Sequence, residues 1–454
     1  MTINDRINFG SKLGVVAAAA GSAVGLGNIW RFPYELGQNG GGAFLIIYLL
    51  CVILLGMPIM LSEFIIGRTG QANAAGSFKK LAPGQKWWIV GLMGVFTSFL
   101  IMGFYVVVSG WTLEYIVQAV SNQFINKDTA TLSRVFADFS TGTLRPIIWI
   151  TVFMIITATI VLAGVQKGIE RSSKFLMPLL LIIIIALGIR AVTLPGGIDG
   201  LRFLFKPDFG KITSEVVLSA MGQAFFSLSL GMGCMITYGS YISKKTNLSK
   251  TVVQVTMLDT VIAILAAIAI FPAVFSLGIN PAQGPELVFI TLPNVFAHMP
   301  GGYVWAILFF VLLCVAALTS TISLLEVIVA YFVEEYKFHR ITIILLATAG
   351  ILFLGVLSSL SLGVWKDVQI FGMGFFSLFD SLTSKILMPV GGLLIAVFTG
   401  WKLNKDSMLE ELSGGGQFKT NFFKFYIFLL RFVAPVAISL IILNQLGLSQ
   451  WLGF

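Results

Sequence analysis

The stretch GSAVGLGNIWRFP, residues 21–33, interrupts the first apolar segment of the chain. Its three glycines and its final proline work against a continuous helix, because Gly is unfavourable in a helix interior and Pro much more so. Asn28 and Arg31 add polar groups that are costly inside a membrane. Broken backbone is tolerated at membrane depth where it lines a protein-enclosed cavity, and its freed groups can then bind ions. We interpret 21–28 as an unwound ion and substrate site; a glycine-rich helix-packing face is the alternative.

The composition is that of a membrane protein with many spans. Of 454 residues, 57% are hydrophobic and 11% are charged, against about 25% charged in a typical soluble domain. The mean hydropathy is +0.94. The net charge of +9 does not indicate a nucleic-acid partner, because cytoplasmic loops of membrane proteins are enriched in Lys and Arg. The three cysteines show no metal or disulfide spacing. The N-terminus lacks a cleavable signal pattern, so the first apolar segment is expected to remain as a span.

Apolar stretches of about 20 residues or more mark membrane spans. The sequence predicts eleven of them, near 12–37, 42–66, 88–121, 146–165, 168–193, 214–241, 251–277, 302–333, 341–360, 371–400 and 421–447. Residues 1–454 are expected to form a single transporter domain in contact with the lipid bilayer. With a cytoplasmic N-terminus, the inner loops hold roughly 18 Lys and Arg and the outer loops roughly 8. An odd number of spans then places the C-terminus outside.

A second interruption lies in the sixth apolar segment, in GQAFFSLSLGMGCMITYGSY, residues 222–241. There Gly231 and Gly233 flank Met232, five spans after the first break. Paired interruptions at corresponding positions of two halves are the best sequence pointer to a transporter site. Spans 1–5 (about 12–193) and 6–10 (about 214–400) would form inverted repeats, followed by an extra helix at about 421–447. A glycine kink in a packed helix is the alternative.

The eighth apolar segment, VAALTSTISLLEVIVAYFVEEYK, carries a cluster of hydroxyl groups. Hard cations prefer oxygen ligands, and Thr319 and Ser320, with the carbonyl of Ala316, supply oxygens. The alternative is that these hydroxyls bond back to the preceding helical turn. The segment between 278 and 300 is Pro-punctuated and has no Lys or Arg. It predicts short helical pieces over an outward vestibule, or a plain outer loop.

These motifs together resemble the neurotransmitter:sodium symporter family. The resemblance covers nearly the whole chain and rests on AVGLGNIWRFP followed by NGGGAFLIIY, on FFSLSLGMG and on ALTSTISLLE. The chain is similar to bacterial members with eleven spans that carry hydrophobic amino acids. The resemblance implies an all-α polytopic membrane protein with two inverted five-helix repeats, broken helices 1 and 6, and an eleventh helix. It also implies the plasma (inner) membrane of a bacterium.

The resemblance further implies two sodium sites, a substrate pocket and no organic cofactor. One sodium site would use the carbonyls of Gly21, Val24 and Ala316 and the hydroxyls of Thr319 and Ser320. The other would use the Ala23 carbonyl, Asn28, Ser227, Asp259 and the carboxylate of the amino-acid substrate. The implied substrate pocket comprises Ala23, Leu26, Gly27, Ile101, Tyr105, Phe226, Ser227, Ser229, Met232, Ser320 and Leu324.

Within this pocket, Tyr105 would donate to the substrate carboxylate and Phe226 would close over the ligand. Arg31 and Asp380 match the family's outer gate pair, and Arg6 and Glu334 match its inner gate pair. Gly168 and Pro178 match a motif at which the fifth helix unwinds to admit cytoplasmic water.

Several residues depart from the common pattern of the family. Gly25 stands where monoamine carriers place an Asp, which favours an amino acid that brings its own carboxylate. Met232 is flexible and favours larger or aromatic substrate side chains. Asp259 stands where many relatives have Asn, so we expect it to replace chloride as the negative charge and to take up a proton on the return step. The alternative places Asp259 in water at a helix end. Glu63 and Glu326 also lie deep in apolar spans, where they would share a proton or bond to the broken backbone around the first site, and we interpret them as structural support.

The sequence therefore predicts a sodium-coupled symporter of hydrophobic or aromatic amino acids that works by alternating access, independently of chloride. The alternatives are a sodium-coupled carrier of another small amino acid with proton antiport, a channel, and a transporter-like ligand sensor. An enzyme is disfavoured, because the only histidines, His298 and His339, lie in no metal-ligand pattern. The identity of the substrate, the stoichiometry and the oligomeric state remain open.

Overall fold

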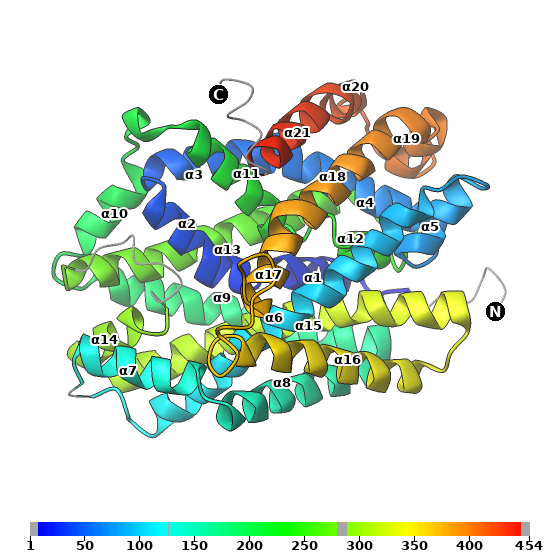
Figure 1. Cartoon of the computed structure of the whole chain (residues 1–454). Helices are drawn as coiled ribbons and strands as arrows, with labels where there is room; N and C mark the ends of the chain where they lie inside the picture. The colour runs from blue at the N-terminus through cyan, green and yellow to red at the C-terminus, as the bar shows by residue number, and fades with distance from the viewer. Residues whose placement is uncertain (1–7, 126, 279–287, 446–454) are drawn as a thin grey trace.

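The computed structural model describes residues 8–125, 127–278 and 288–445, and helices dominate it (Figure 1). In the described residues, nine helices are long and apolar enough to cross a membrane. They are Gly42–Gly70, Trp88–Val120, Leu144–Leu162, Val165–Val192, Leu248–Ser276, Gly302–Tyr336, Arg340–Leu360, Phe375–Lys402 and Phe423–Asn444. A tenth crossing is the bent pair Lys12–Ala23 and Gly27–Gln38, whose halves meet at 50°. The predicted count of eleven spans is not confirmed.

The missing span is the sixth predicted one, at 214–241. It is divided between α11 (Ser214–Ser227) and α12 (Cys234–Gly239), which are separated by non-helical residues 228–233. Neither piece is long enough alone to cross about 30 Å of hydrocarbon at 1.5 Å per residue. The predicted second interruption is therefore present, and it is longer than the first.

The elements of the crossings are as follows. The first consists of α1 (Lys12–Ala23), the π-helical segment η1 (Gly27–Arg31) and α2 (Phe32–Gln38). The others are α3 (Gly42–Cys51) with η2 (Val52–Gly56) and α4 (Met57–Gly70), α6 (Trp88–Val120), α8 (Leu144–Leu162), η3 (Val165–Glu170) with α9 (Arg171–Val192), α13 (Leu248–Ser276), α15 (Gly302–Tyr336), α16 (Arg340–Leu360), α17 (Phe375–Ser381) with η6 (Leu382–Leu387), α18 (Met388–Val397) and η7 (Phe398–Lys402), and α20 (Phe423–Phe428) with η8 (Leu429–Val433) and α21 (Ala434–Gln445).

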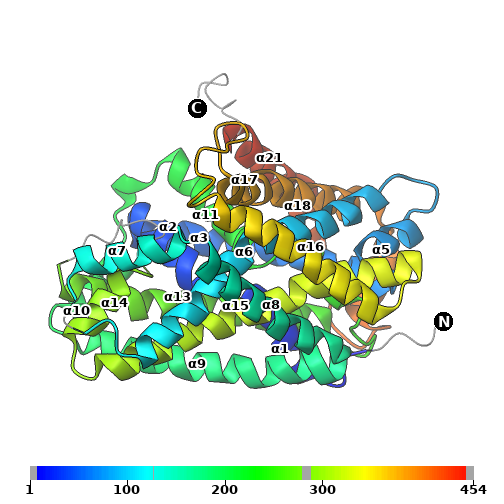
Figure 2. The ribbon, with the colours of Figure 1, turned by 60° about the horizontal axis from the view of Figure 1, so that its bottom comes forward.

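Short helices connect the crossings at both ends of the bundle. They are α5 (Ala74–Leu81), α7 (Thr129–Ser140), α10 (Gly197–Phe205), η4 (Phe209–Lys211), α14 (Thr291–His298) and α19 (Lys405–Ser413). Helices α5 and α19 lie at one end of the molecule, and α7, α10 and α14 lie at the other (Figures 1 and 2). Helix α14 is one helical piece within the predicted loop 278–300, of which 279–287 lie outside the described residues.

The two broken crossings lie inside the bundle. Helix α1 packs against α9, α13 and α15, and α12 packs against α4 and α15. All six residues of α12 are buried, which fits its apolar sequence CMITYG. Because the intact helices shield both breaks from lipid, the freed backbone groups can be satisfied by protein side chains.

Candidate ion and substrate site

The first break exposes backbone groups that side chains from other helices contact. Helix α1 ends at Ala23, and Val24 is extended with ψ 105°. The Ser22 carbonyl accepts hydrogen bonds from Ser229 Oγ (2.9 Å) and Ser320 Oγ (3.3 Å). The Leu26 N–H donates to the Tyr105 hydroxyl at 2.9 Å. Residues 21–28 therefore contain a genuine interruption with side-chain partners, as predicted, and do not form a continuous helix-packing face.

The second break depends on left-handed backbone. Ser229, Gly231 and Gly233 have φ of 53°, 76° and 79°. A Cβ on Gly231 would lie 2.4 Å from the Met388 carbonyl oxygen, so this position requires glycine on both conformational and steric grounds.

The buried carboxylates of Glu63 and Glu326 bond to groups outside the first break, where they were predicted to act. Glu63 accepts the Gly231 N–H at 2.8 Å, so it supports the second break and not the first. Glu326 accepts from the Tyr241 hydroxyl at 2.8 Å and from Arg340 Nη2 at 2.6 Å. The expectation that both support the first site is wrong, because each lies closer to other donors.

A polar cluster joins the first break to α11 and α13. Asn28 Nδ2 lies 2.7 Å from Asp259 Oδ1 and 3.0 Å from Ser227 Oγ. Ser227 donates to Asp259 Oδ2 at 2.8 Å, and Asn28 Oδ1 accepts the Gly25 N–H at 3.0 Å. Asp259 is fully buried in the middle of α13, so the alternative of a carboxylate in water at a helix end is wrong. The sequence analysis overlooked Tyr48, whose hydroxyl donates to Ser227 at 3.2 Å.

A second group of oxygens lies between α1 and α15. Thr319 Oγ1 is 3.3 Å from the Val24 carbonyl oxygen and 3.0 Å from the Ala316 carbonyl oxygen. Gly21 is adjacent, because a Cβ placed there would lie 3.4 Å from Thr319 Cβ. The back-bonding alternative is also present, since the Ala316 carbonyl at 3.0 Å and the Val315 carbonyl at 3.3 Å both belong to the preceding turn of α15. The Val24 carbonyl is the contact that back-bonding does not explain, because it comes from the first break.

The two breaks enclose a small cavity of about 20 Å³. Its lining is Ser22, Ala23, Gly25, Gly27, Ile101, Tyr105, Phe226, Ser229, Met232, Ser320 and Leu324. Nine of these are predicted substrate residues. Leu26 and Ser227 are predicted but do not line the cavity: Leu26 contributes its N–H to Tyr105, and Ser227 bonds to Asp259.

Ser22 and Gly25 line the cavity although the sequence analysis did not assign them to the pocket. Both belong to the stretch 21–28, Ser22 in the last turn of α1 and Gly25 in the break itself, so the whole of that stretch was the signal available. A Cβ on Gly25 would lie 2.3 Å from Ser320 Oγ and 2.7 Å from the Tyr105 hydroxyl. The structure therefore has no room for the Asp that monoamine carriers place here.

The proposed outer gate residues lie together above the cavity. Arg31 Nη1 is 3.6 Å from Asp380 Oδ1, and Arg31 Nε is 3.6 Å from Glu35 Oε1. The Arg31 Cζ also lies 4.6 Å from the centroid of the Phe226 ring. One cation thus links the first break, α17 and the ring that lines the cavity; Glu35 is a partner that the sequence analysis missed.

The inner gate is described only in part. Arg6 lies outside the described residues. Glu334 accepts the Asn73 N–H at 2.6 Å. Gly168 lies in η3 and Pro178 lies inside α9, and the helix runs through both from Val165 to Val192. The unwinding of this helix stays a prediction.

The donor chemistry of both clusters suits a hard cation. Across the part of the chain that the structure describes, no group of three or more His, Cys, Asp or Glu side chains could hold a metal ion. Both polar clusters instead present carbonyl, hydroxyl, amide and single-carboxylate oxygens, which suit a hard cation.

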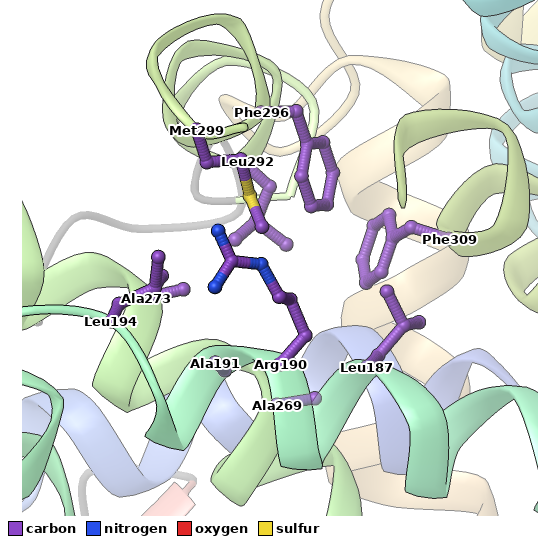
Figure 3. A pocket seen from close by; sticks show the side chains of 10 residues that line it. All are labelled: Leu187, Arg190, Ala191, Leu194, Ala269, Ala273, Leu292, Phe296, Met299 and Phe309. Carbon is purple, nitrogen blue, oxygen red and sulfur yellow. The ribbon is translucent and has the colours of Figure 1, made fainter. Parts of the chain in front are cut away.

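A second cavity, at the end of the bundle that holds α14, does not resemble an ion or substrate site. It measures about 10 Å³ and is enclosed mainly by apolar side chains around Arg190 (Figure 3). The Arg190 guanidinium points from α9 toward Met299 and Leu292, and its Nη1 donates to Thr193 Oγ1 at 3.1 Å. This arrangement is that of a long side chain reaching the interface along apolar surface.

The family assignment now rests on comparison as well as geometry. The family model of the sodium:neurotransmitter symporter family matches residues 6–133 and 124–451. The chain belongs to the sodium:neurotransmitter symporter family. An uncharacterized sodium-dependent transporter, YhdH, of Bacillus subtilis is 42% identical over 449 residues, covering 98% of this chain and 99% of the relative. An uncharacterized sodium-dependent transporter of Haemophilus influenzae is 41% identical over 462 residues, covering 98% and 100%.

A solved relative has the same fold. The crystal structure of MhsT in complex with L-phenylalanine superposes with a TM-score of 0.91 at 47% identity, covering 97% of this chain and 100% of that one. The chain is therefore an all-helical, multi-pass membrane transporter of this symporter family and not an enzyme. Its bacterial relatives place it in the plasma membrane.

Proposed function

We propose that this protein is a sodium-coupled symporter of hydrophobic or aromatic amino acids that works by alternating access. The observation that carries the proposal is the cavity between the two helix breaks, which is lined by Tyr105 and Gly25. The Tyr105 hydroxyl accepts the Leu26 N–H, and the Gly25 N–H donates to Asn28 of the Asn28–Ser227–Asp259 cluster. Backbone N–H groups and a phenolic donor suit a carboxylate. Ile101, Met232 and Leu324 give the same cavity an apolar wall.

The expected coupling follows from shared ligands. One sodium ion would take oxygens from Ala23, Asn28, Ser227 and Asp259 together with the substrate carboxylate, so ion and substrate would raise each other's affinity reciprocally. The second would take the oxygens of Gly21, Val24, Ala316, Thr319 and Ser320. The buried Asp259 would supply the negative charge, which makes transport independent of chloride.

The presence of phenylalanine in the MhsT complex supports an apolar or aromatic substrate for this chain. The cavity is much smaller than such a side chain, so substrate entry requires the wall, including Met232, to move. The outer path would close through Arg31, Asp380 and Phe226. The inner path would open through the Arg6–Glu334 pair and the segment from Gly168 to Pro178.

The proposal extends to topology. Residues 1–454 would form one transporter domain of two inverted repeats plus a final helix, with the N-terminus in the cytoplasm and the C-terminus outside. The surplus of Lys and Arg in the loops on the side of the N-terminus supports this orientation.

The test is uptake of labelled phenylalanine, leucine, tryptophan, methionine and alanine into proteoliposomes, with sodium and chloride exchanged independently. We expect uptake that requires sodium, ignores chloride and favours the larger apolar side chains. Uptake driven equally well without sodium would refute the coupling, and a steep dependence on chloride would refute the role of Asp259.

A substitution links uptake to the cavity. Tyr105→Phe removes the hydroxyl that accepts the Leu26 N–H and that would donate to the substrate carboxylate. We expect KM for the substrate to rise about tenfold, since a lost hydrogen bond to a charged group such as this carboxylate costs about 1.5–3 kcal/mol. Tyr238→Phe is the matched control. The Tyr238 hydroxyl donates a 2.8 Å hydrogen bond to Ser323 Oγ, and neither residue lines the cavity. Equal changes in KM for both variants would argue against the assigned pocket.

A further inference from the structure

A cavity of about 550 Å³ lies outside the candidate transport site, between the start of α1 and the start of α13. Lys12 and Leu13 of α1 and Lys250 of α13 line it, and Phe418, after α19, closes one side. It is far larger than the central cavity and lies at the end of the bundle that holds α5 and α19.

The cavity is cationic and lacks a counter-charge. Lys12 and Lys250 are both exposed, and neither forms an ion pair with another described residue. No acidic side chain is among its described lining residues. Asn247 caps the Lys250 N–H at 3.0 Å, and the two ammonium groups are the charged donors at this cavity. Two ammonium groups that line one cavity suit a phosphate, with which ammonium groups form charge-assisted hydrogen bonds.

An apolar stripe continues from this cationic rim into the membrane. Val253, Met257 and Val261 of α13 are 42%, 62% and 44% exposed and lie three, seven and eleven residues after Lys250, on the same helical face. Gln254, which also lines the cavity, is the polar residue on this face next to Lys250, so the apolar part of the stripe lies beyond it. Eleven residues of helix span about 16 Å, close to the depth of one hydrocarbon leaflet of about 15 Å. Leu13 adds a 69% exposed apolar side chain from α1.

We propose that this cavity binds the phosphate of an anionic phospholipid, whose acyl chains lie along the α13 stripe. A zwitterionic lipid carries its own ammonium group, which Lys12 and Lys250 would repel, whereas a soluble phosphate would leave the stripe unused. Since the lipid would bridge α1 and α13, it would hold the first half-helix, which ends at the candidate ion site, against the bundle.

The experiment measures lipid binding and not transport. The delipidated full-length protein in a neutral detergent is titrated with phosphatidylglycerol or phosphatidylcholine, and bound lipid is counted by native mass spectrometry. We expect tight binding of phosphatidylglycerol only, and about thirtyfold weaker binding in the Lys12→Gln/Lys250→Gln variant, since each of the two basic residues near a membrane surface contributes on the order of 1 kcal/mol.

The controls separate binding in this cavity from a general effect of surface charge. Lys86→Gln/Lys405→Gln removes two exposed charges from the same end outside the cavity and should bind like the wild type. Met257→Gln keeps both charges and should weaken binding through the stripe alone. Equal binding of phosphatidylcholine to the wild type, unchanged binding in the Lys12/Lys250 variant, or competition by inorganic phosphate at matched concentration would each overturn the proposal. Monodisperse gel filtration shows that the variants fold.

Discussion

At the scale of single residues, Asp259 is the group to which the proposed ion site assigns the negative charge. Its two carboxylate oxygens accept from Asn28 and Ser227, and it is fully buried. The sequence placed an unusual carboxylate in an apolar span, but only the packing of α11, α13 and the first break brings these donors to it.

Asp259→Asn tests this role. An amide has one oxygen, so it can replace only one of the two carboxylate oxygens that accept from Asn28 and Ser227. Its NH₂ group would then face either the Asn28 NH₂ group or the Ser227 hydroxyl, both of which now donate. We expect the sodium concentration for half-maximal uptake to rise about tenfold or more, because a lost hydrogen bond to a charged group costs about 1.5–3 kcal/mol. Asp199→Asn is the control, since it removes the same charge from the exposed α10. Unchanged sodium affinity would exclude Asp259 from the ion site.

Gly25→Ala tests whether substrate binding in the cavity requires a residue without a side chain at position 25. The added Cβ would meet Ser320 Oγ at 2.3 Å and the Tyr105 hydroxyl at 2.7 Å, so we expect binding of labelled amino acid to fall below detection while the protein still folds. Gly222→Ala is the matched control, because nothing lies within 4 Å of its Cβ position. Wild-type binding by Gly25→Ala would show that the substrate lies elsewhere.

At the scale of elements, the start of α1 is fastened to η3 by one carboxylate. Glu170 accepts from the Gly10 N–H at 2.6 Å and from Ser11 Oγ at 3.0 Å, and Lys174 Nζ lies 2.6 Å away. Gly14 leaves room for this contact, since a Cβ there would lie 2.0 Å from Glu170 Oε1. Glu170 lies between Gly168 and Pro178, so winding of this helix is tied to the position of α1.

Glu170→Gln should loosen that connection. The neutral amide weakens the charge-assisted bonds to Gly10, Ser11 and Lys174. We expect amide hydrogen exchange at residues 9–14 to become about tenfold faster, as a loss of about 1.4 kcal/mol in local stability predicts. Glu410→Gln on the exposed face of α19 should leave the exchange of 9–14 unchanged. Equal protection in both variants would show that Glu170 does not hold α1.

At the scale of the whole molecule, a buried Arg68 joins distant parts of the chain. It is 1% exposed, and its Nε lies 2.7 Å from Glu411 Oε2 of α19 while its Nη1 donates to the Thr246 carbonyl at 2.6 Å. One guanidinium thus connects α4, α19 and the loop that precedes α13.

Arg68→Leu should destabilise the protein as a whole. The change removes the nearest cation of Glu411, which keeps only Lys244 Nζ at 3.4 Å, and it removes the guanidinium donor of the Thr246 carbonyl. Removing one partner of a buried ion pair typically costs about 3–5 kcal/mol. We expect the thermal transition in detergent to fall by several degrees, whereas Lys244→Gln, whose ammonium contacts Glu411 from solvent, should change it little. Similar melting of both variants would mean that Arg68 is not a structural link.

The sequence by itself determined the class of the protein and the two interruptions, because glycine and proline weaken a helix and so mark where a span is broken. Most of the predicted residues around the cavity came from the resemblance to the symporter family. Only the tertiary structure decided which donor each buried carboxylate meets. Glu63 and Glu326 are indistinguishable in an apolar helix, yet one caps the second break and the other pairs with Arg340. The partners of Ser22, Tyr48 and Arg68 belong to helices far along the chain, and no local pattern encodes such contacts.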